Sequence, residues 1–442
     1  MSKRVAIIGA GFSGTMTAVQ LARRGIDVTL IGRAPQVGKG VAYSTEDPAH
    51  LLNIPAVKMG AWPDAPGDFA AATGSDPEAY VPRMLFGRYL RDILDASAVT
   101  VIEGEAVAAE PGEGWTVRMA DGSSIAADAL VLAPGNQAPD ALRQARDLPE
   151  HLFAADLWGP AGRAAIAAAV ASGGDVLVVG SSLSMIDVAL SLDAAGHKGK
   201  LVAVSRRGQM PRIHLPKMSA VPASDDAPSG SLLDLWRWVR QRTDEVDWRD
   251  AVDSVRPRTH ALWQSLSLDD QRRFMRHARP WWGVHRHRIA PRAGAIVERM
   301  IAEGRMEVLA GRIQTLREKD GPSTSSGQGL EAVIRQRGAA ASDAARRFAV
   351  GINCTGPLHA IARTRDPVLR SLLDAGLAEP DALGIGLKVD DNVRVIGADR
   401  LWAMGSLGKA RYWEIIAVPD IRVQAAEVAD AIAKELINVV QS

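Results

Sequence analysis

The sequence predicts an α/β fold in which one strand–turn–helix pattern occurs twice. Residues 4–31 read RVAIIGAGFSGTMTAVQLARRGIDVTLI, and residues 176–187 read VLVVGSSLSMID. In both segments an apolar run ends at a glycine and an apolar helical pattern follows. In addition, residues 99–135 and 306–357 each contain three apolar segments separated by turns. We therefore expect two similar halves, each a βαβ unit with a three-strand meander.

The bulk composition is that of a globular protein without a strong net charge. The chain has 442 residues, which is too long for one core, and 47% of them are hydrophobic. With 52 basic and 51 acidic residues the net charge is +1, so no field of one sign attracts nucleic acid or an anionic membrane. We expect no membrane span, because no apolar stretch is long enough, and no signal peptide at the short apolar start.

The cysteine and histidine content argues against metal and disulfide chemistry. Cys354 is the one cysteine, so the chain holds no internal disulfide and no dithiol pair, which fits a reducing cytoplasm. His285 and His287 alternate, but no third ligand lies near them in sequence, and we expect no metal. Cys354 is expected to be a small buried residue at a strand end.

The first glycine motif is GxGxxG in its expected context, between a strand and a helix. Gly9 permits the tight turn, Gly11 lets the backbone approach a pyrophosphate, and Gly14 lets helix and strand pack closely. Phe12 and Ser13 lie between them, where free N–H groups at the helix start face the phosphates. This turn predicts a dinucleotide site, and FAD is the expected ligand.

One usual part of this site is missing at the end of the second strand. A carboxylate normally occupies this position and binds the ribose hydroxyls, but Gly32 stands there and Arg33 follows. Either the ribose is held by other groups, or Arg33 lies over the adenine or near a phosphate. Further along, residues 50–56 (HLLNIPA) are apolar with one amide, Asn53. They predict either the edge of a flavin ring or a buried loop.

The second glycine motif predicts an exchangeable NADPH site. Its turn and helix start are Gly180, Ser181, Ser182, Leu183 and Ser184. Ser182 replaces a glycine, so the ligand is expected to approach less closely than FAD does at the first motif. The following strand ends in Ser205-Arg206-Arg207, where an NAD site has an acid. Two guanidinium groups match a ribose 2′-phosphate, although a solvated basic turn is the alternative.

Several sequence blocks together resemble a known family. The blocks are GAGFSG, GKGVAYS, HLLNIPAVKM, YVPRMLFGRYL, SRRGQMPRIH, DWRDAVDSVRP, RPWWGVHRHRIAP, INCTGP and WEIIAVPDIRVQA. The chain resembles the YdhS-like FAD/NAD(P)-binding proteins, a branch of the two-dinucleotide-domain flavoproteins related to N-hydroxylating and Baeyer–Villiger-type monooxygenases. The resemblance implies FAD, NADPH and a soluble oxidoreductase. The remaining expected cofactor contacts are Gly40, Tyr43, Asn53, Met59, Val107, Pro134, Gly135, Gly405 and Ala417.

The expected architecture is two Rossmann-like dinucleotide-binding domains, glutathione-reductase-like, with the NADPH domain inserted into the FAD domain. The predicted FAD domain covers 1–160 and 345–442, and the NADPH domain covers 161–344. A Trp-rich helical insert is expected at about 212–295, either as a cap over an acidic or polar substrate or as a solvated helix surface. A helix starting near Ile416 is expected to direct its positive end toward the flavin.

The leading hypothesis is a single-component monooxygenase that uses molecular oxygen. In it, NADPH reduces the flavin, a C4a-hydroperoxyflavin forms, and a small polar substrate is hydroxylated. Asn53, Trp413 and Glu414 are the residues expected to line the flavin. The alternatives are an NADPH-dependent flavin reductase or oxidase that inserts no oxygen, and a non-catalytic flavoprotein that binds a partner protein.

Overall fold

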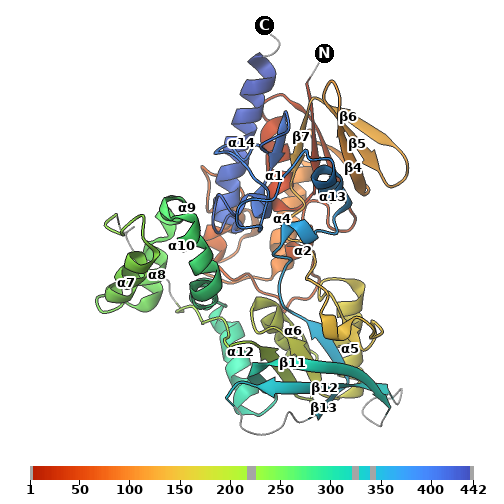
Figure 1. Ribbon diagram of the computed structural model, residues 1–442, viewed down its shortest axis with the longest axis vertical. Helices are drawn as coiled ribbons and strands as arrows, with labels where there is room; N and C mark the ends of the chain where they lie inside the picture. Colours follow the sequence, from red (N-terminus) through yellow and green to blue (C-terminus); the bar gives the residue numbers. More distant parts are fainter. Residues whose placement is uncertain (1–2, 217–224, 321–327, 339–344, 439–442) are drawn as a thin grey trace.

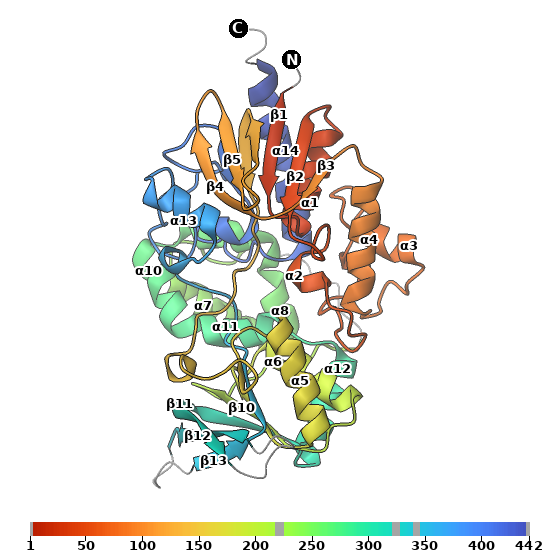
Figure 2. The ribbon, with the colours of Figure 1, turned by 90° about the vertical axis from the view of Figure 1, so that its right-hand side faces the viewer.

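Two β-sheets, each with a parallel core, organise the computed structural model, which describes residues 3–216, 225–320, 328–338 and 345–438. The sheets lie toward opposite ends of the long axis, and both termini lie at the end of the first sheet (Figures 1 and 2). No helix within these ranges is both long enough and apolar enough to cross a membrane. The predicted α/β fold with two Rossmann-like domains is confirmed.

The first sheet is parallel throughout and combines segments that are distant in sequence. Its strand order is β15 (Leu401–Ala403), β7 (Ala129–Leu132), β1 (Arg4–Ile8), β2 (Asp27–Gly32) and β3 (Thr100–Glu103). The central strands are continuous apolar runs, as expected for strands buried on both faces. Helix α1 (Phe12–Ala22) packs on the C-terminal helix α14 (Val418–Asn438) over this sheet. The first domain is therefore discontinuous.

The remaining elements of the first domain surround this sheet. They are the antiparallel sheet β4 (Ala106–Pro111), β5 (Trp115–Met119) and β6 (Ser124–Ala127), and the helices α2 (Gly40–Tyr43), α3 (Asp68–Thr73), α4 (Arg83–Asp95) and α13 (Pro367–Asp374). Short 3₁₀ turns lie at Ala56–Lys58, Ile361–Arg363 and Gly405–Gly408. One apolar core joins these elements to α14.

The second sheet repeats this plan and extends it. Its order is β13 (Ala345–Phe348), β12 (Gln328–Gln336), β11 (Met306–Asp320), β10 (Leu201–Ser205), β9 (Val176–Val179), β14 (Val350–Asn353) and β8 (Phe153–Ala154). Strand β11 pairs parallel with β10 and then antiparallel with β12. Helices α5 (Pro160–Ser172), α6 (Leu183–Ala194) and α12 (Pro291–Ala302) share an apolar core with it.

The order of the central strands explains why one glycine motif occurs twice. In the first sheet β1 lies between β7 and β2, and in the second sheet β9 lies between β14 and β10, all parallel. The predicted domain boundaries need correction. Because β8 pairs with β14 and β14 with β9, residues 153–154 and 345–353 belong to the second sheet. The second domain thus extends beyond the predicted limits of 161 and 344 on both sides.

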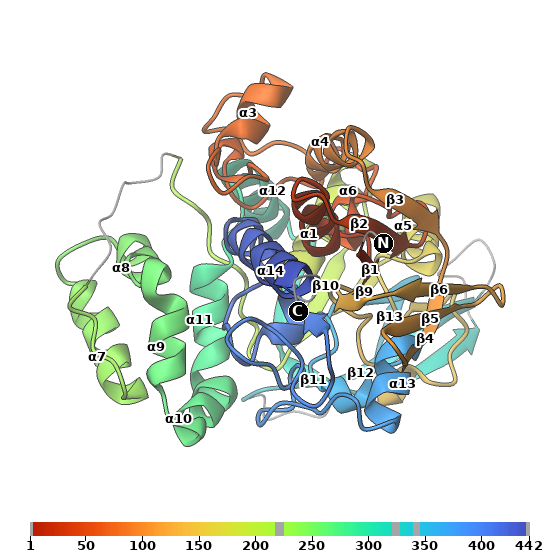
Figure 3. The same cartoon turned by 90° about the horizontal axis from the view of Figure 1, so that it is seen from above.

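The insert is a helical body beside the two sheets (Figures 1 and 3). It contains α7 (Leu232–Arg242), α8 (Trp248–Ser254), a 3₁₀ turn (Arg256–Arg258), α9 (Thr259–Ser265), α10 (Leu268–Arg273), a π-helical turn (Phe274–Ala278) and α11 (Arg279–Arg286). Two small apolar clusters hold these helices together. Part of the predicted insert, 217–224, lies outside the described residues.

Candidate functional site

The first glycine turn leaves a cradle at the start of α1. A Cβ on Gly9, which has φ 108°, would lie 2.1 Å from the carbonyl oxygen of Ala133, and one on Gly14 would lie 1.9 Å from the carbonyl oxygen of Gly9. Glycine is therefore required at both positions. At Gly11 the nearest atom to a Cβ is Gly40 Cα at 3.5 Å, an ordinary contact, so a Cβ would not clash there. A bare backbone before the free N–H groups of a helix lets a pyrophosphate approach closely.

Two predicted loops from elsewhere in the chain meet at this turn. A Cβ on Gly40 would lie 2.9 Å from Gly11 Cα, and one on Gly405 would lie 2.9 Å from Ser13 Oγ. Both glycines have positive φ, so a side chain would also strain the backbone. The Gly405 N–H donates to Gln424 Oε1 at 3.1 Å, which ties this loop to α14. Ala417 directly precedes that helix, close to the predicted start at Ile416.

The end of β2 shows why no carboxylate stands there. A Cβ on Gly32 would lie 2.4 Å from the Cβ of Ala10, so any side chain would collide with the glycine turn. Arg33 is exposed and pairs with Glu105 at 3.4 Å. Val107 falls at a register shift between β4 and β5, which leaves its backbone outside the ladder. Glu105 is a carboxylate beside the predicted adenosine end that sequence reasoning missed, because it follows β3 rather than β2.

The other predicted flavin contacts take different positions. The Tyr43 ring packs edge-on against an aromatic ring of α4, with 4.6 Å between the ring centres. Met59 is buried in the core of the first domain, so its side chain is not available to a ligand. Pro134 and Gly135 follow β7, and the Gly135 carbonyl accepts from Ser406 Oγ at 2.7 Å. Gly135 is therefore linked to the Gly405 loop.

The second glycine turn has nearly the same backbone as the first. A Cβ on Gly180 would lie 2.1 Å from the carbonyl oxygen of Cys354, the same distance as for Gly9 with Ala133. Ser182 precedes α6 with φ −102° and ψ −157°, and Gly11 precedes α1 with φ −84° and ψ −170°. Because this conformation does not require glycine, Ser182 fits without strain. Its exposed hydroxyl makes no capping bond.

The turn after β10 is tied to this glycine turn. Ser181 is buried, and its hydroxyl donates to the carbonyl of Gln209 at 2.5 Å and lies 2.8 Å from Ser205 Oγ. Arg206 is exposed and Arg207 partly exposed. Within the described part of the chain neither arginine has an acidic partner, so both can take an anion. Leu183 and Ser184 open α6, and a buried methionine follows where the first motif has its third glycine.

A buried polar cluster lies where the insert meets the first domain. His214 Nε2 donates to the carbonyl of Asn53 at 3.0 Å, and the rings of Tyr80 and His214 are 5.6 Å apart. Arg288 is 2% exposed and forms an ion pair with Asp253. Three buried atoms here lack a hydrogen-bond partner among the described residues: Tyr80 Oη, His214 Nδ1 and Arg288 Nε. Buried polar atoms without a partner are rare in native proteins, so we expect a bound water or ligand to satisfy these three.

The protonation state of this cluster follows from burial and the nearby cations. Burial, and after it the charge of Arg288, lower the pKa of His214 to about 4. His214 is therefore neutral at neutral pH, and since Nε2 donates, Nδ1 is left as an acceptor. Burial raises the pKa of Tyr80 to about 12, so its hydroxyl stays protonated. Sequence reasoning missed the cluster because its members lie in separate segments with no shared pattern.

Trp413 and Glu414 hold the insert in place. Glu414 has φ 69°, and its buried carboxylate accepts from Trp282 Nε1 at 2.5 Å and Arg286 Nε at 2.9 Å. Burial raises the pKa of Glu414. Arg286 and the other hydrogen-bonding and charged groups around the carboxylate together lower it by more, so the pKa lies below its usual value. Trp413 stacks on Trp263 of α9 at 4.9 Å. The carboxylate is thus engaged with the insert rather than presented as a free acid.

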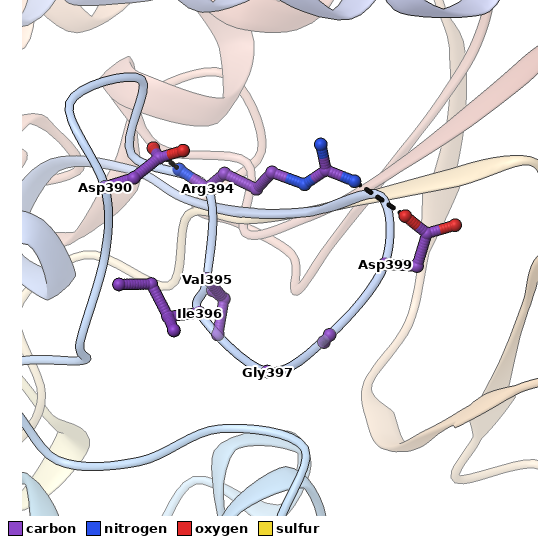
Figure 4. Close-up of a pocket in the computed structure, with 7 residues that line it drawn as sticks. Asp390, Arg394, Val395, Ile396, Gly397 and Asp399 are labelled. Carbon is purple, nitrogen blue, oxygen red and sulfur yellow. Dashed lines mark hydrogen bonds and ion pairs between the residues drawn. The ribbon is translucent and has the colours of Figure 1, made fainter.

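A separate hollow is shown in close-up in Figure 4. It is lined by Asp390, Arg394, Val395, Ile396, Gly397, Ala398 and Asp399. Arg394 Nη2 donates to Asp399 Oδ1 at 2.6 Å across it. Residues 396–399 precede β15, so the hollow lies at the amino end of that strand. The glycine turns follow the carboxyl ends, and this hollow is not part of the candidate site.

Comparisons with known proteins identify the fold. Residues 6–137 match a family described as FAD-NAD(P)-binding. Ornithine hydroxylase PvdA from Pseudomonas aeruginosa is 15% identical, with a TM-score of 0.66 over 99% of this chain and 100% of that one. Ornithine N-hydroxylase KtzI from Kutzneria sp. 744, in a structure with reduced FAD, NADP⁺ and L-ornithine, is 15% identical, with a TM-score of 0.65 over 99% and 100%.

A third solved structure has the same architecture. L-lysine 6-monooxygenase from Pseudomonas syringae is 17% identical, with a TM-score of 0.65 over 98% of this chain and 99% of that one. No curated protein matches the chain in sequence. At these identities the likeness shows the fold alone, which has two Rossmann-like domains.

Proposed function

We propose that this chain is a FAD- and NADPH-dependent monooxygenase that hydroxylates a small polar amine. The family match over residues 6–137 supports FAD at the first glycine turn, and the matching backbone of the second turn supports NADPH there. The three similar structures named above are hydroxylases and a monooxygenase of ornithine and lysine, which supports an amine as the substrate. Bound FAD would supply the redox chemistry, accepting hydride from NADPH and activating oxygen.

The chain's own residues would bind and orient FAD. The free N–H groups of α1 would bind the pyrophosphate at the bare backbone of Gly11. Gly40 and Gly405 would lie next to it. At the adenosine end, Glu105 is the carboxylate proposed to replace the contact that Gly32 cannot make, and the unpaired backbone of Val107 faces the same end.

The second turn would bind NADPH through its pyrophosphate and its 2′-phosphate. Ser182 would contribute its hydroxyl where the first turn has a glycine, because its side chain is exposed and makes no capping bond. Arg206 and Arg207 would recognise the 2′-phosphate, since Ser181 and Ser205 hold their turn against the glycine turn. A weaker, exchangeable site suits a co-substrate that must leave after each turnover.

The observation that carries the substrate assignment is the buried polar cluster at Tyr80, His214 and Arg288. Its three unpartnered atoms offer one acceptor, one hydroxyl and one cationic donor beside the Asn53 carbonyl. Neutral His214 can accept a hydrogen bond from an N–H group, and Arg288 can donate to an oxygen. A molecule with both groups would satisfy all three atoms, whereas a simple flavin reductase needs no such cluster.

The cysteine content argues against the disulfide-reducing chemistry that other two-domain flavoproteins perform. Cys354 is the one cysteine of the sequence, it is buried, and burial raises the pKa of its thiol well above the usual range. A redox-active pair within one chain is therefore excluded. A single inert thiol also suits a reducing compartment, and we propose that the protein works in the cytoplasm.

A substrate screen tests this function. Purified protein with FAD and NADPH is given amines, basic amino acids and purines, and NADPH oxidation, hydrogen peroxide and product mass are measured together. The proposal expects one class of compound to accelerate NADPH oxidation and to gain one oxygen atom, with little peroxide. Peroxide equal to the NADPH consumed with every compound would instead identify an oxidase.

A further inference from the structure

Three cationic side chains and one histidine, from four separate parts of the chain, interact electrostatically. Arg206 follows β10, and Arg279 begins α11 of the insert. His359 lies after β14, and Lys409 follows the 3₁₀ turn Gly405–Gly408 of the first domain. Arg279 Nη2 lies 2.9 Å from His359 Nε2 and 3.3 Å from its Nδ1. The cluster therefore combines residues of the first domain, the second domain and the insert.

The cations of this cluster act on one another without a compensating acid. Partial burial of the His359 ring and the charges of Arg279, Lys409 and Arg206 together lower its pKa to about 4. Burial also lowers the pKa of Lys409 to about 8, with Arg279 again adding to it. Across the ranges described by the structure, neither arginine nor Lys409 has an ion pair with a carboxylate. Such like-charge groups repel one another unless an anion joins them.

The nearest acid does not neutralise the cluster. Asp381 raises the pKa of Lys409, but less than the cations and burial lower it. The Asp381 carboxylate accepts hydrogen bonds from the backbone N–H groups of Leu383, Ile385 and Gly386. It is held by its own loop and does not reach an ion-pair distance from Lys409.

The cluster lies at the surface, beside a small pocket. Lys409 lines a pocket together with Gly135, Asn136, Gln137, Leu358, Ile361, Ile385, Ser406 and Leu407. Gly135 has positive φ, and a Cβ placed on it would meet no atom within 4 Å, so the pocket wall is open at that point. His359 follows one lining residue in sequence, and its side chain is exposed. A ligand can therefore reach the cluster from solvent.

We propose that Arg206, Arg279, His359 and Lys409 form a binding site for a phosphate group. Planar guanidinium groups and an ammonium group are the usual partners of phosphate oxygens. The phosphate could come from the 2′-phosphate or the pyrophosphate of NADPH, or it could be free inorganic phosphate. Bound there, it would link the insert to both domains. The NADPH sources rest on the proposed function, but phosphate binding itself does not require that function.

Calorimetric titration with three ligands tests the site and identifies the source. Wild-type protein, Arg279→Gln and Lys409→Gln are titrated with 2′-AMP, ADP-ribose and inorganic phosphate. Arg272→Gln, which removes an exposed cation of α10 in the same insert, is the matched control. We expect both cluster variants to lose about tenfold in affinity for the ligand that occupies the site, and the control to lose less than about twofold.

Each outcome decides the proposal. A loss for 2′-AMP assigns the 2′-phosphate, a loss for ADP-ribose alone assigns the pyrophosphate, and a loss for inorganic phosphate alone assigns a free anion. The proposal fails if all three ligands bind both variants as they bind wild type. Circular dichroism and the charge-preserving Arg279→Lys variant separate a lost contact from a lost fold. No flavin reduction or hydroxylation is measured, so a negative substrate screen leaves this result unaffected.

Discussion

Arg83 and Asp187 join the two domains through a buried ion pair with two hydrogen bonds. Arg83 Nη1 lies 3.0 Å from Asp187 Oδ2, and Nη2 lies 2.9 Å from Oδ1. Their side chains are 14% and 4% exposed. Arg83 begins α4 of the first domain, and Asp187 lies on α6, the helix that follows the second glycine turn. The pair therefore fixes the NADPH-side helix relative to the predicted flavin site.

Removing one partner of this pair should destabilise the protein strongly. Arg83→Met leaves a buried carboxylate without its cation, and breaking a buried pair in this way costs about 3–5 kcal/mol. Chemical denaturation followed by circular dichroism measures the loss. Arg118→Gln is the control, since it breaks the exposed Arg118–Glu110 pair and should change stability very little. Equal effects from the two variants would mean that the domains are not held together by Arg83.

Substitution of Gly11 should remove FAD binding, whereas substitution of Gly9 should reduce the stability of the fold. At Gly11 a side chain has space in the fold and would occupy the proposed place of the pyrophosphate, so Gly11→Val should fold but purify without FAD. At Gly9 a Cβ would collide with the Ala133 carbonyl, so Gly9→Val should lose stability. Flavin absorbance and thermal unfolding separate the two effects. A yellow Gly11→Val protein with full FAD content would contradict this cradle.

Arg206 and Arg207 should determine the preference for NADPH over NADH. Each charge-assisted hydrogen bond to the 2′-phosphate contributes about 1.5–3 kcal/mol, and exposure favours the lower end. Mutation of either residue to alanine should raise the KM for NADPH about tenfold and leave the KM for NADH nearly unchanged. The rate of flavin reduction at saturating NADPH should change little. A parallel loss with both nucleotides would make these arginines structural.

The phosphate site should lose affinity in alkaline solution. Lys409 must carry its proton to bind an anion. Burial and Arg279 lower its pKa and Asp381 raises it, and the resulting pKa in the free protein is about 8. His359 is already neutral at this pH. Affinity should therefore fall as pH rises above about 8, by up to about tenfold per unit. Titrations from pH 7 to about 9.5 test this, and Lys409→Arg should flatten the curve.

The same pKa shift sets a stability effect. The folded-state pKa of Lys409 lies below its unfolded value, so the charged form costs stability at pH values below about 8. That cost disappears as pH rises from about 8 toward the unfolded pKa of 10.5. Lys409→Gln should therefore raise the unfolding temperature at pH 7 in phosphate-free buffer, and the gain should vanish near pH 10. A lower unfolding temperature at pH 7 would contradict the uncompensated charge.

The glycine turns could be predicted from sequence because their geometry is local. Gly9, Gly11 and Gly180 each follow an apolar strand at fixed spacing, and the backbone needs of each position are set within a few residues. The two departures from the usual motif, at Gly32 and Ser182, also have local causes, but only the three-dimensional structure shows them. Gly32 faces Ala10, and Ser182 has a backbone conformation that any residue adopts.

The parts that sequence could not predict depend on distant pairing. The domain boundaries at 160 and 344 were misplaced because β8 and β14 are short strands whose sheet is decided by partners far along the chain. Tyr80, His214 and Arg288 lie in three segments that carry no common motif. The predicted flavin-lining role of Glu414 remains a prediction, and its visible contacts are with the insert. Residues that come together from three separate segments leave no periodic pattern in the sequence.

The proposed substrate site at Tyr80, His214 and Arg288 should respond to mutation separately from the cofactor sites. His214→Phe removes the acceptor Nδ1 and the donor to Asn53, and Tyr80→Phe removes one hydroxyl while keeping the ring. Tyr80→Phe should raise the KM of the amine substrate while FAD content and the KM for NADPH stay unchanged. Steady-state kinetics with the accelerating amine measures this. A rise in the KM for NADPH alone would mean that the nicotinamide, rather than the substrate, binds at this cluster.

The central claim is that NADPH and oxygen are used to insert one oxygen atom into a substrate. Turnover under ¹⁸O₂ with the accelerating amine, followed by mass spectrometry of the product and a count of NADPH consumed, tests it most directly. The account predicts one ¹⁸O atom in the product for each NADPH oxidised, and little hydrogen peroxide. Product without ¹⁸O, with peroxide equal to the NADPH consumed, would contradict it and identify an oxidase built on the same fold.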